Sequence, residues 1–193
     1  MLKQFPKDIN RETFLFCQIM KKDNSTELLP IVDEGGNVQG CATRGECHDG
    51  SKRLHPVVHL HLLNDGGQLY LQQRPQWKDI QPGKWDTAVG GHVDYGEGVN
   101  EALLREVKEE LGINNIEPQF ILRYVFESER ERELIYVYRA VYNGDVSPSE
   151  ELDGGRFWDV EEVMASLGNG IFTPNFEQEF LRCMRGIIHG APM

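Results

Sequence analysis

Residues 91–113 read GHVDYGEGVNEALLREVKEELGI, and this stretch is the most informative part of the sequence. A glycine-rich loop is predicted over residues 90–98, and the apolar residues of 100–111 recur at helical spacing. Gly112 follows directly, as is common for the residue that ends a helix. The stretch therefore predicts a strand, a glycine loop and a helix in succession.

Three glutamates of this helix share one narrow face. With about 100° per residue and Glu106 set at zero, Glu109 lies at about −60° and Glu110 at about +40°. Like charges at this spacing cost roughly 0.2–0.5 kcal/mol per pair, and anions near a helix C-terminus cost about 0.3–1 kcal/mol more. A hard divalent cation such as Mg²⁺ would remove both costs and keep water ligands for a substrate phosphate. The alternative is a solvated acidic face that Arg105 and Lys108 partly neutralise.

The other face of the predicted helix is apolar. Leu104, Val107 and Leu111 lie between about 100° and 160° on the same wheel. We therefore expect these residues to anchor the helix on the core, while the opposite face presents the carboxylates.

Strands and helices are interspersed along the rest of the chain. The predicted strands are residues 28–33, 55–63, 69–73, 120–126 and 134–142. Helices are predicted over 160–167 and 174–188, the second with Thr173 as N-cap and Pro174 as its first residue. The fold class is therefore α/β or α+β, with a mixed β-sheet flanked by helices.

Length and charge limit the classes of function. The 193 residues are 39% hydrophobic, which suits one domain over residues 27–193 with an N-terminal extension over 1–26. In that extension, residues 14–20 are predicted as a short helix or strand. The net charge of −11 argues against binding to a nucleic-acid backbone or to anionic membranes. The sequence contains no signal-peptide pattern, no membrane-length apolar run and no CxxC pair, so we expect a cytoplasmic protein with reduced thiols.

The loop and helix match the pattern Gly-x5-Glu-x7-Arg-Glu-U-x-Glu-Glu-x-Gly-U, in which U is a bulky apolar residue. The matching residues are Gly91, Glu97, Arg105, Glu106, Val107, Glu109, Glu110, Gly112 and Ile113. The stretch thus resembles the Nudix box of the MutT-like Nudix hydrolases at every defined position. The resemblance implies an α/β/α sandwich and hydrolysis of a nucleoside diphosphate linked to another group, or of a similar small-molecule diphosphate.

The resemblance also implies roles for individual residues. Glu106, Glu109 and Glu110 would hold Mg²⁺ or Mn²⁺, joined by the main-chain carbonyl of Gly90. The structural positions of the box are Gly91, Glu97, Arg105 and Gly112. Metal chemistry of this kind polarises a phosphoryl oxygen and activates water for in-line displacement.

A longer region, residues 31–160, resembles the isopentenyl-diphosphate isomerase-like branch of the same family. The segments that carry this resemblance read IVDEGGNVQG, ATRGECHDGSKRLHPVV and LQQRPQWKDIQPGKWDTAVGGHV. The metal-site positions of the isomerase match His48, His55, His92, Glu131 and Glu133, and its diphosphate-binding pair matches Arg74 and Lys78. From the residue types alone, a structural or substrate-contact role of His48 and His55 stays open beside the metal role.

One position departs from the isomerase pattern. The isomerase has a catalytic cysteine directly before a Gly-His pair, whereas this chain has Gly90 there, and Val89 cannot substitute for it. Allylic proton transfer would lack one of its two acid/base partners. We therefore expect a hydrolase, with an isomerase-like enzyme or a nucleotide-binding domain without activity as the alternatives.

Other residues are candidates for the general base or for substrate contact. The base is a box glutamate or a glutamate of a later segment, for which Glu133, Glu150 and Glu151 are the candidates. Trp77, Trp85 and Tyr95 could contact a substrate, with core packing as the commoner use of Trp85. His59 and His61 are expected to be ordinary half-buried positions on the strand face of His55, and a homodimer completed by residues 1–26 and the C-terminal helix is compatible with the sequence.

Overall fold

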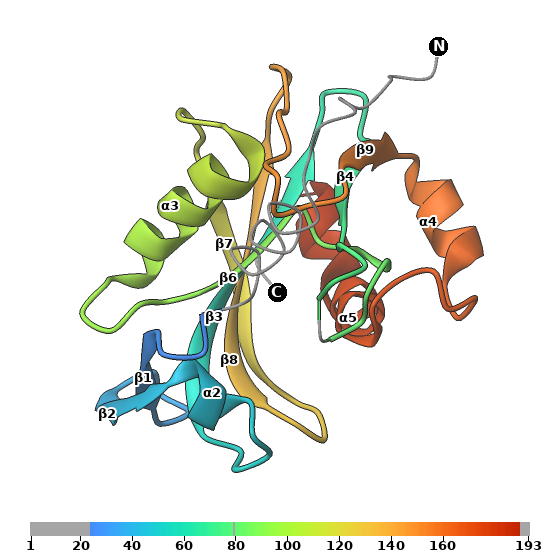
Figure 1. Ribbon diagram of the computed structural model, residues 1–193. Helices are drawn as coiled ribbons and strands as arrows, with labels where there is room; N and C mark the ends of the chain where they lie inside the picture. Colours follow the sequence, from blue (N-terminus) through green and yellow to red (C-terminus); the bar gives the residue numbers. More distant parts are fainter. Residues whose placement is uncertain (1–23, 79, 190–193) are drawn as a thin grey trace, which may run out of the picture.

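The computed structural model describes residues 24–78 and 80–189, and a mixed β-sheet forms its centre (Figure 1). The strands of this sheet are β3 (Leu54–Leu63), β4 (Leu69–Gln73), β5 (Trp85–Asp86), β6 (Val89–His92), β7 (Gln119–Glu127), β8 (Arg132–Val141) and β9 (Gly155–Trp158). Their order is β5–β4–β3–β8–β7, with β6 paired to β3 and β9 paired to β4. Because β3 runs parallel to β8 but antiparallel to β4 and β6, the predicted mixed sheet is confirmed.

Helices cover both faces of this sheet. Helix α3 (Val99–Leu111) lies on one side, and α4 (Val160–Ser166) and α5 (Pro174–His189) lie on the other (Figure 1). Each side has its own apolar core, with Leu103 and Val107 of α3 in one and Phe176 and Phe180 of α5 in the other. The expected sandwich of helix, sheet and helix is therefore confirmed. Among the described residues, no helix is long and apolar enough to cross a membrane.

Strand β3 is central because both of its faces are covered. Each residue of the strand is buried, and alternate side chains point to opposite faces of the sheet. Val58 and Leu60 belong to the core beneath α3, whereas Val57 and Leu63 belong to the core beneath α5. The histidines of β3 at the alternate positions therefore lie on the α5 side, with Val57.

A small subdomain precedes the central sheet. Strands β1 (Leu28–Val32) and β2 (Val38–Thr43) pair with each other, and α2 (Arg44–Cys47) follows directly (Figure 1). The sequence predicts β1 but not β2 or α2, because most of β2 is exposed and lacks an apolar alternation. Thr43 and Glu46 begin α2 with a reciprocal capping box, which is a local signal that the prediction missed.

The remaining predicted elements agree closely with the structure. The Thr173 hydroxyl accepts a hydrogen bond from the Phe176 N–H at 3.1 Å, and α5 starts at Pro174, as predicted. The strand predicted before the glycine loop corresponds to β5 and β6, although β6 extends into residues that were predicted as loop. Strand β9 was not predicted. The predicted element over residues 14–20 lies outside the described residues.

Candidate functional site

Two glutamates of α3 lie over the paired glycines of β6. Glu110 is only 9% exposed, and its carboxylate accepts a hydrogen bond from the Gly90 N–H at 3.2 Å. A Cβ atom on Gly91 would clash with the Glu106 carboxyl group, so the missing side chain leaves the space that this carboxyl group occupies. The side chain of Glu109, in contrast, is 58% exposed.

This arrangement corrects the predicted orientation of the helix. Leu104, which was expected in the core, is 47% exposed, whereas Leu103 and Val107 are buried. The helix is rotated so that Glu106 and Glu110 approach the sheet, because the glycines beneath them provide room for two carboxyl groups. A fully solvated acidic face is therefore excluded for these two glutamates.

Arg105 connects the helix to the preceding loop. Its guanidinium donates to both carboxylate oxygens of Glu97, each at 2.9 Å, and to the main-chain oxygen of His92 at 3.0 Å. The same group donates to Glu106 at 2.8 Å and to Glu109 at 3.2 Å. One cation thus orients two of the three candidate metal ligands, and its bidentate pair with Glu97 ties the loop to the helix.

The electrostatics of the carboxylates suit a bound cation. Burial raises the pKa of Glu106 to about 7, although Arg105 opposes the shift. Burial and the charge of Glu106 raise the pKa of Glu110 well above its ordinary value, and Glu151 adds negative charge near both groups. Closely spaced, partly desolvated carboxylates are oxygen ligands that hard cations prefer, so this set fits the expected Mg²⁺ or Mn²⁺.

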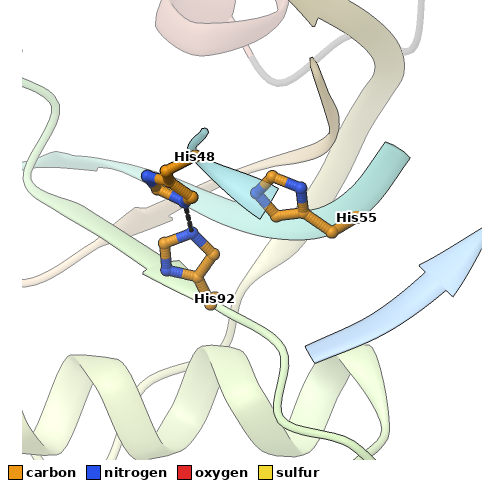
Figure 2. A group of neighbouring side chains, drawn as sticks. All are labelled: His48, His55 and His92. Carbon is orange, nitrogen blue, oxygen red and sulfur yellow. Dashed lines mark hydrogen bonds between the residues drawn. The ribbon is translucent and has the colours of Figure 1, made fainter. Parts of the chain in front are cut away.

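A second cluster, of histidines, lies on the α5 side of the sheet. His48 follows α2, His55 lies at the start of β3, and His92 ends β6. Figure 2 shows the three rings converging, and one ligand atom from each lies within 4.8 Å of the others. Nε2 of His48 and Nε2 of His92 are 3.1 Å apart. The structure thus brings together three residues that are far apart in the sequence.

Two glutamates, one in the turn between β7 and β8 and one in β8, complete this cluster. Glu131 lies 3.2 Å from Nδ1 of His48, and Glu133 lies 4.0 Å from Nε2 of His55. Both glutamates are buried. Burial, reinforced by the charge of Glu131, raises the pKa of Glu133 to about 8. All five residues predicted for the second metal site therefore meet at one place.

The protonation of the histidines bears on metal binding. Burial lowers the pKa of His55, and burial together with Arg44 lowers that of His92 well below its ordinary value, so both rings are neutral. Nε2 of His55 is buried and has no hydrogen-bond partner among the described residues, which suits a metal ligand. Arg44 approaches Nδ1 of His92 at 3.2 Å and places the proton of that ring on Nε2. A cation on Nε2 of His92 would therefore require this proton to leave and Arg44 to move.

The two candidate phosphate-binding residues lie near both clusters. Arg74 pairs with Asp86 at 3.4 Å, and its guanidinium also donates to the main-chain oxygen of Ile80. Burial is the main cause of the raised pKa of Glu110 and of the lowered pKa of His92. The positive charge of Lys78 acts on both groups, since it opposes the shift of Glu110 and adds to the shift of His92. These positions suit contact with an anion that reaches either side of β6.

The aromatic candidates separate into core and surface positions. Trp85 packs edge-on against Trp158, with 5.1 Å between the ring centroids, in agreement with its expected core role. Lys78 lies over the ring of Trp77 at 4.8 Å from its centroid, and Tyr95 is 53% exposed. Trp77 and Tyr95 therefore remain the aromatic candidates for substrate contact.

Two histidines differ from their predicted environment. His59 is 7% exposed and His61 is fully buried, and both bond to Glu179 of α5, at 2.9 and 2.6 Å. The expectation of ordinary half-buried positions was wrong, because a buried carboxylate from the opposite layer pairs with both rings. The sequence did contain a signal: Glu179 lies beside Phe176 and Phe180 on the apolar face of α5.

Comparison with known proteins gives a consistent result. A family model described as the NUDIX domain matches residues 53–176. The chain is 30% identical to an isopentenyl-diphosphate Delta-isomerase from Photorhabdus laumondii, over 80% of this chain and 93% of the relative. It is 32% identical to an uncharacterized Nudix hydrolase from Streptomyces coelicolor, over 84% and 92% of the two chains. Relatives named as isomerases and relatives named as hydrolases thus match at similar identity.

Solved structures resemble the same region. A crystal structure of a Deinococcus radiodurans protein superimposes with a TM-score of 0.72 and 26% identity, over 82% of this chain and 100% of the other. A MutT protein from Methanosarcina mazei superimposes with a TM-score of 0.62 and 26% identity, over 70% of this chain and 96% of the other.

Proposed function

This chain belongs to the Nudix family, and from that premise we propose that it is a metal-dependent pyrophosphohydrolase. Its substrate would be a small molecule with a diphosphate linkage, such as a nucleoside diphosphate joined to another group. The observation that carries the proposal is the placement of Glu106 and Glu110 against the Gly90–Gly91 pair, where burial disfavours uncompensated charge.

On the α3 side, some residues bind the metal ion and another orients these ligands. Glu106, Glu109 and Glu110 hold Mg²⁺ or Mn²⁺ together with the carbonyl oxygen of Gly90, and the bound cation supplies Lewis-acid activation of phosphate and water. Arg105 orients Glu106 and Glu109 through the hydrogen bonds described above.

The substrate and the attacking water are positioned by other groups. Arg74 and Lys78 bind the substrate phosphates. Glu151 is our candidate for the general base, because its charge acts on the carboxyl groups of Glu106 and Glu110. Glu133 is the alternative base for a substrate that reaches the α5 side, and Glu150 is the remaining candidate.

The histidine cluster supports a second candidate function, an isomerase-like enzyme. His48, His55, His92, Glu131 and Glu133 are the positions that match the isomerase metal site, and their ligand atoms lie close together. We propose that these five residues hold a second metal ion in either case. Gly90 favours the hydrolase, since it supplies no side chain for the second proton transfer.

The test is a substrate panel with purified protein and either Mg²⁺ or Mn²⁺. It includes nucleotide sugars, dinucleotides, nucleoside triphosphates and isopentenyl diphosphate. A metal ion contributes several kcal/mol to such a reaction, so Glu110→Gln should lower turnover by about 10³-fold. Glu101→Gln is the matched control, because Glu101 is exposed on the same helix and glutamine also suits its capping position.

The outcomes separate the candidate functions. Hydrolysis that depends on Glu110 and not on Glu101 supports the proposal. Conversion of isopentenyl to dimethylallyl diphosphate without hydrolysis favours the second candidate. The hydrolase proposal fails if no panel compound is cleaved, or if Glu110→Gln retains full turnover.

A further inference from the structure

The buried carboxylate of Glu110 is oriented differently from the other two glutamates of its helix. Arg105 donates to Glu106 and to Glu109, whereas Glu110 accepts from the Gly90 N–H at 3.2 Å and from Nε2 of Gln72 at 3.4 Å. Gln72 lies 38 positions before Glu110 in the sequence and belongs neither to the box nor to the histidine cluster. Its contact with a candidate metal ligand therefore needs an explanation of its own.

Strand β4 carries Gln72 on the α3 side of the sheet. Tyr70 belongs to the core beneath α3, and Leu71 belongs to the core beneath α5. Because alternate side chains of a strand share a face, Gln72 lies on the side of Tyr70, and Gln73 lies on the side of Leu71. Gln72 is only 4% exposed, and burial of an amide costs free energy unless the amide is hydrogen-bonded. The bond to Glu110 offsets this cost.

The two donors approach the same oxygen atom of Glu110. The Gly90 N–H and the Gln72 amide both donate to Oε2. Oε1 accepts no hydrogen bond from the described residues, and it is not closed off from solvent. Carboxylates that bind a metal ion are commonly hydrogen-bonded to the surrounding protein in this way. One oxygen of Glu110 is thus held by the protein, while the other is available to a ligand.

We propose that Gln72 is a positioning residue of the metal site, whose amide holds Oε2 of Glu110 together with the Gly90 N–H and leaves Oε1 for the cation. This inference rests on the proposed function, which makes Glu110 a metal ligand. A neutral amide suits the task, because it orients the carboxylate without adding a positive charge that would compete with the metal ion. The effect of Gln72 is exerted through Glu110 and requires no contact with the metal ion or the substrate.

Gln73 provides the matched control. It is the next residue of β4, and its Nε2 also donates a hydrogen bond, at 3.3 Å to the main-chain oxygen of Gly83. Methionine has a length similar to that of glutamine but no N–H group. The experiment measures Mg²⁺ binding by calorimetry, because Mg²⁺ prefers carboxylate oxygens to imidazole nitrogens. Gln72→Met should weaken Mg²⁺ binding by about 10- to 100-fold, as is usual when a metal ligand loses its partner, whereas Gln73→Met should bind like the wild type.

A double-mutant cycle separates positioning from a general effect on the fold. The same titration is repeated with Glu110→Ala and with Gln72→Met in the Glu110→Ala background. If Gln72 acts through Glu110, its substitution should change the remaining Mg²⁺ affinity by less than about twofold once Glu110 is replaced. A merely structural role would lower the affinity by the same factor in both backgrounds, and that result would overturn the inference.

A measurement on the unmodified protein covers the case in which the variants do not fold. With ¹⁵N-labelled glutamine, Mg²⁺ should shift the side-chain amide resonances of Gln72, because the carboxylate that accepts from this amide would bind the cation. The side-chain resonances of Gln73 should stay in place. Equal losses of affinity in Gln72→Met and Gln73→Met, no loss in Gln72→Met, or an unmoved Gln72 resonance would each contradict the assigned role.

These results are distinguishable from a failure of the proposed function. If hydrolysis depends on Glu110 while Gln72→Met binds Mg²⁺ normally, only the inference fails. If the wild type neither binds Mg²⁺ nor cleaves any panel compound, the proposed function fails and the inference with it.

Discussion

The two sides of strand β6 carry two different kinds of polar cluster. On the α3 side, Glu106 and Glu110 come from one helix, and Arg105 of the same helix neutralises part of their charge. On the α5 side, three histidines and two glutamates come from the residue after α2, from β3 and β6, from the turn before β8 and from β8 itself. The first cluster is local in sequence and the second exists only in the folded chain. Helical periodicity can therefore reveal the first, whereas only a resemblance could suggest the second.

The largest effect in this comparison is expected for Gly91→Ala, and not for the same substitution at the adjacent Gly90. Gly91→Ala places a methyl group where the Glu106 carboxyl group lies, so it must displace a metal ligand, and a misplacement of about 1 Å can cost about 10²-fold in rate. Overpacking of this kind also costs about 1–3 kcal/mol of stability. Turnover assays and thermal unfolding would measure both losses.

Gly90→Ala is the matched comparison for folding stability. Its methyl group would meet His59 and Thr87 at 3.6–3.9 Å, which is ordinary van der Waals contact. We expect its melting temperature to stay close to that of the wild type. If Gly91→Ala and Gly90→Ala lower the melting temperature equally, the space available for a side chain does not differ between the two sides of β6.

A second prediction concerns the metal ion that we propose for the histidine cluster. Loss of a group outside the ligand set typically costs about 10- to 100-fold in metal affinity, and removal of a ligand should cost at least as much. His55→Ala should therefore weaken Mn²⁺ or Zn²⁺ binding at this site while the α3 site keeps its own ion. Calorimetric titration would show one ion per chain instead of two. Two tightly bound ions in His55→Ala would contradict the assignment.

A smaller effect is expected at Arg105. Arg105→Lys keeps the charge but loses the fork that reaches Glu97, Glu106 and Glu109 together. We expect kcat/KM to fall by about tenfold, the lower end of the range for residues that orient metal ligands. Lys108→Ala, at an exposed position of the same helix, is the control. Equal activity of the two variants would show that Arg105 does not position the ligands.

The smallest expected effect is on stability at Glu109. Its side chain is 58% exposed, and its pair with Arg105 is of the surface type that contributes about 0.3–0.5 kcal/mol. Glu109→Gln should therefore unfold at nearly the same denaturant concentration as the wild type, even where metal affinity falls. A loss of several kcal/mol would mean that Glu109 is as integral to the packing as Glu110.

Much of the fold follows from short-range patterns, but the orientation of α3 does not. The wheel correctly brings Glu106 and Glu110 together, whereas Glu109 is exposed, and the capping pattern at Thr173 correctly places the start of α5. The wheel fails for Leu104, because it assigns the buried side by hydrophobicity alone, whereas the glycines of β6 let two carboxyl groups pack inward.

The environment of the strand histidines was equally beyond a local pattern. His59 and His61 have their partner, Glu179, on a helix more than a hundred residues away. Nothing in β3 itself indicates this pairing. The lone glutamate on the apolar face of α5 is the feature that a careful reading of the sequence could have used.

The neighbouring glycines of β6 also constrain how the sequence of this protein can change. Space for a side chain exists at residue 90 and is lacking at residue 91, so a single base change in one codon is structurally silent while the same change in the next is disruptive. The open position is the one that the resemblance described above would match to the isomerase cysteine. Gly90→Cys would introduce a thiol beside His59 at a position whose Cβ meets only ordinary van der Waals contacts, which makes this position the natural starting point for directed evolution between the two chemistries.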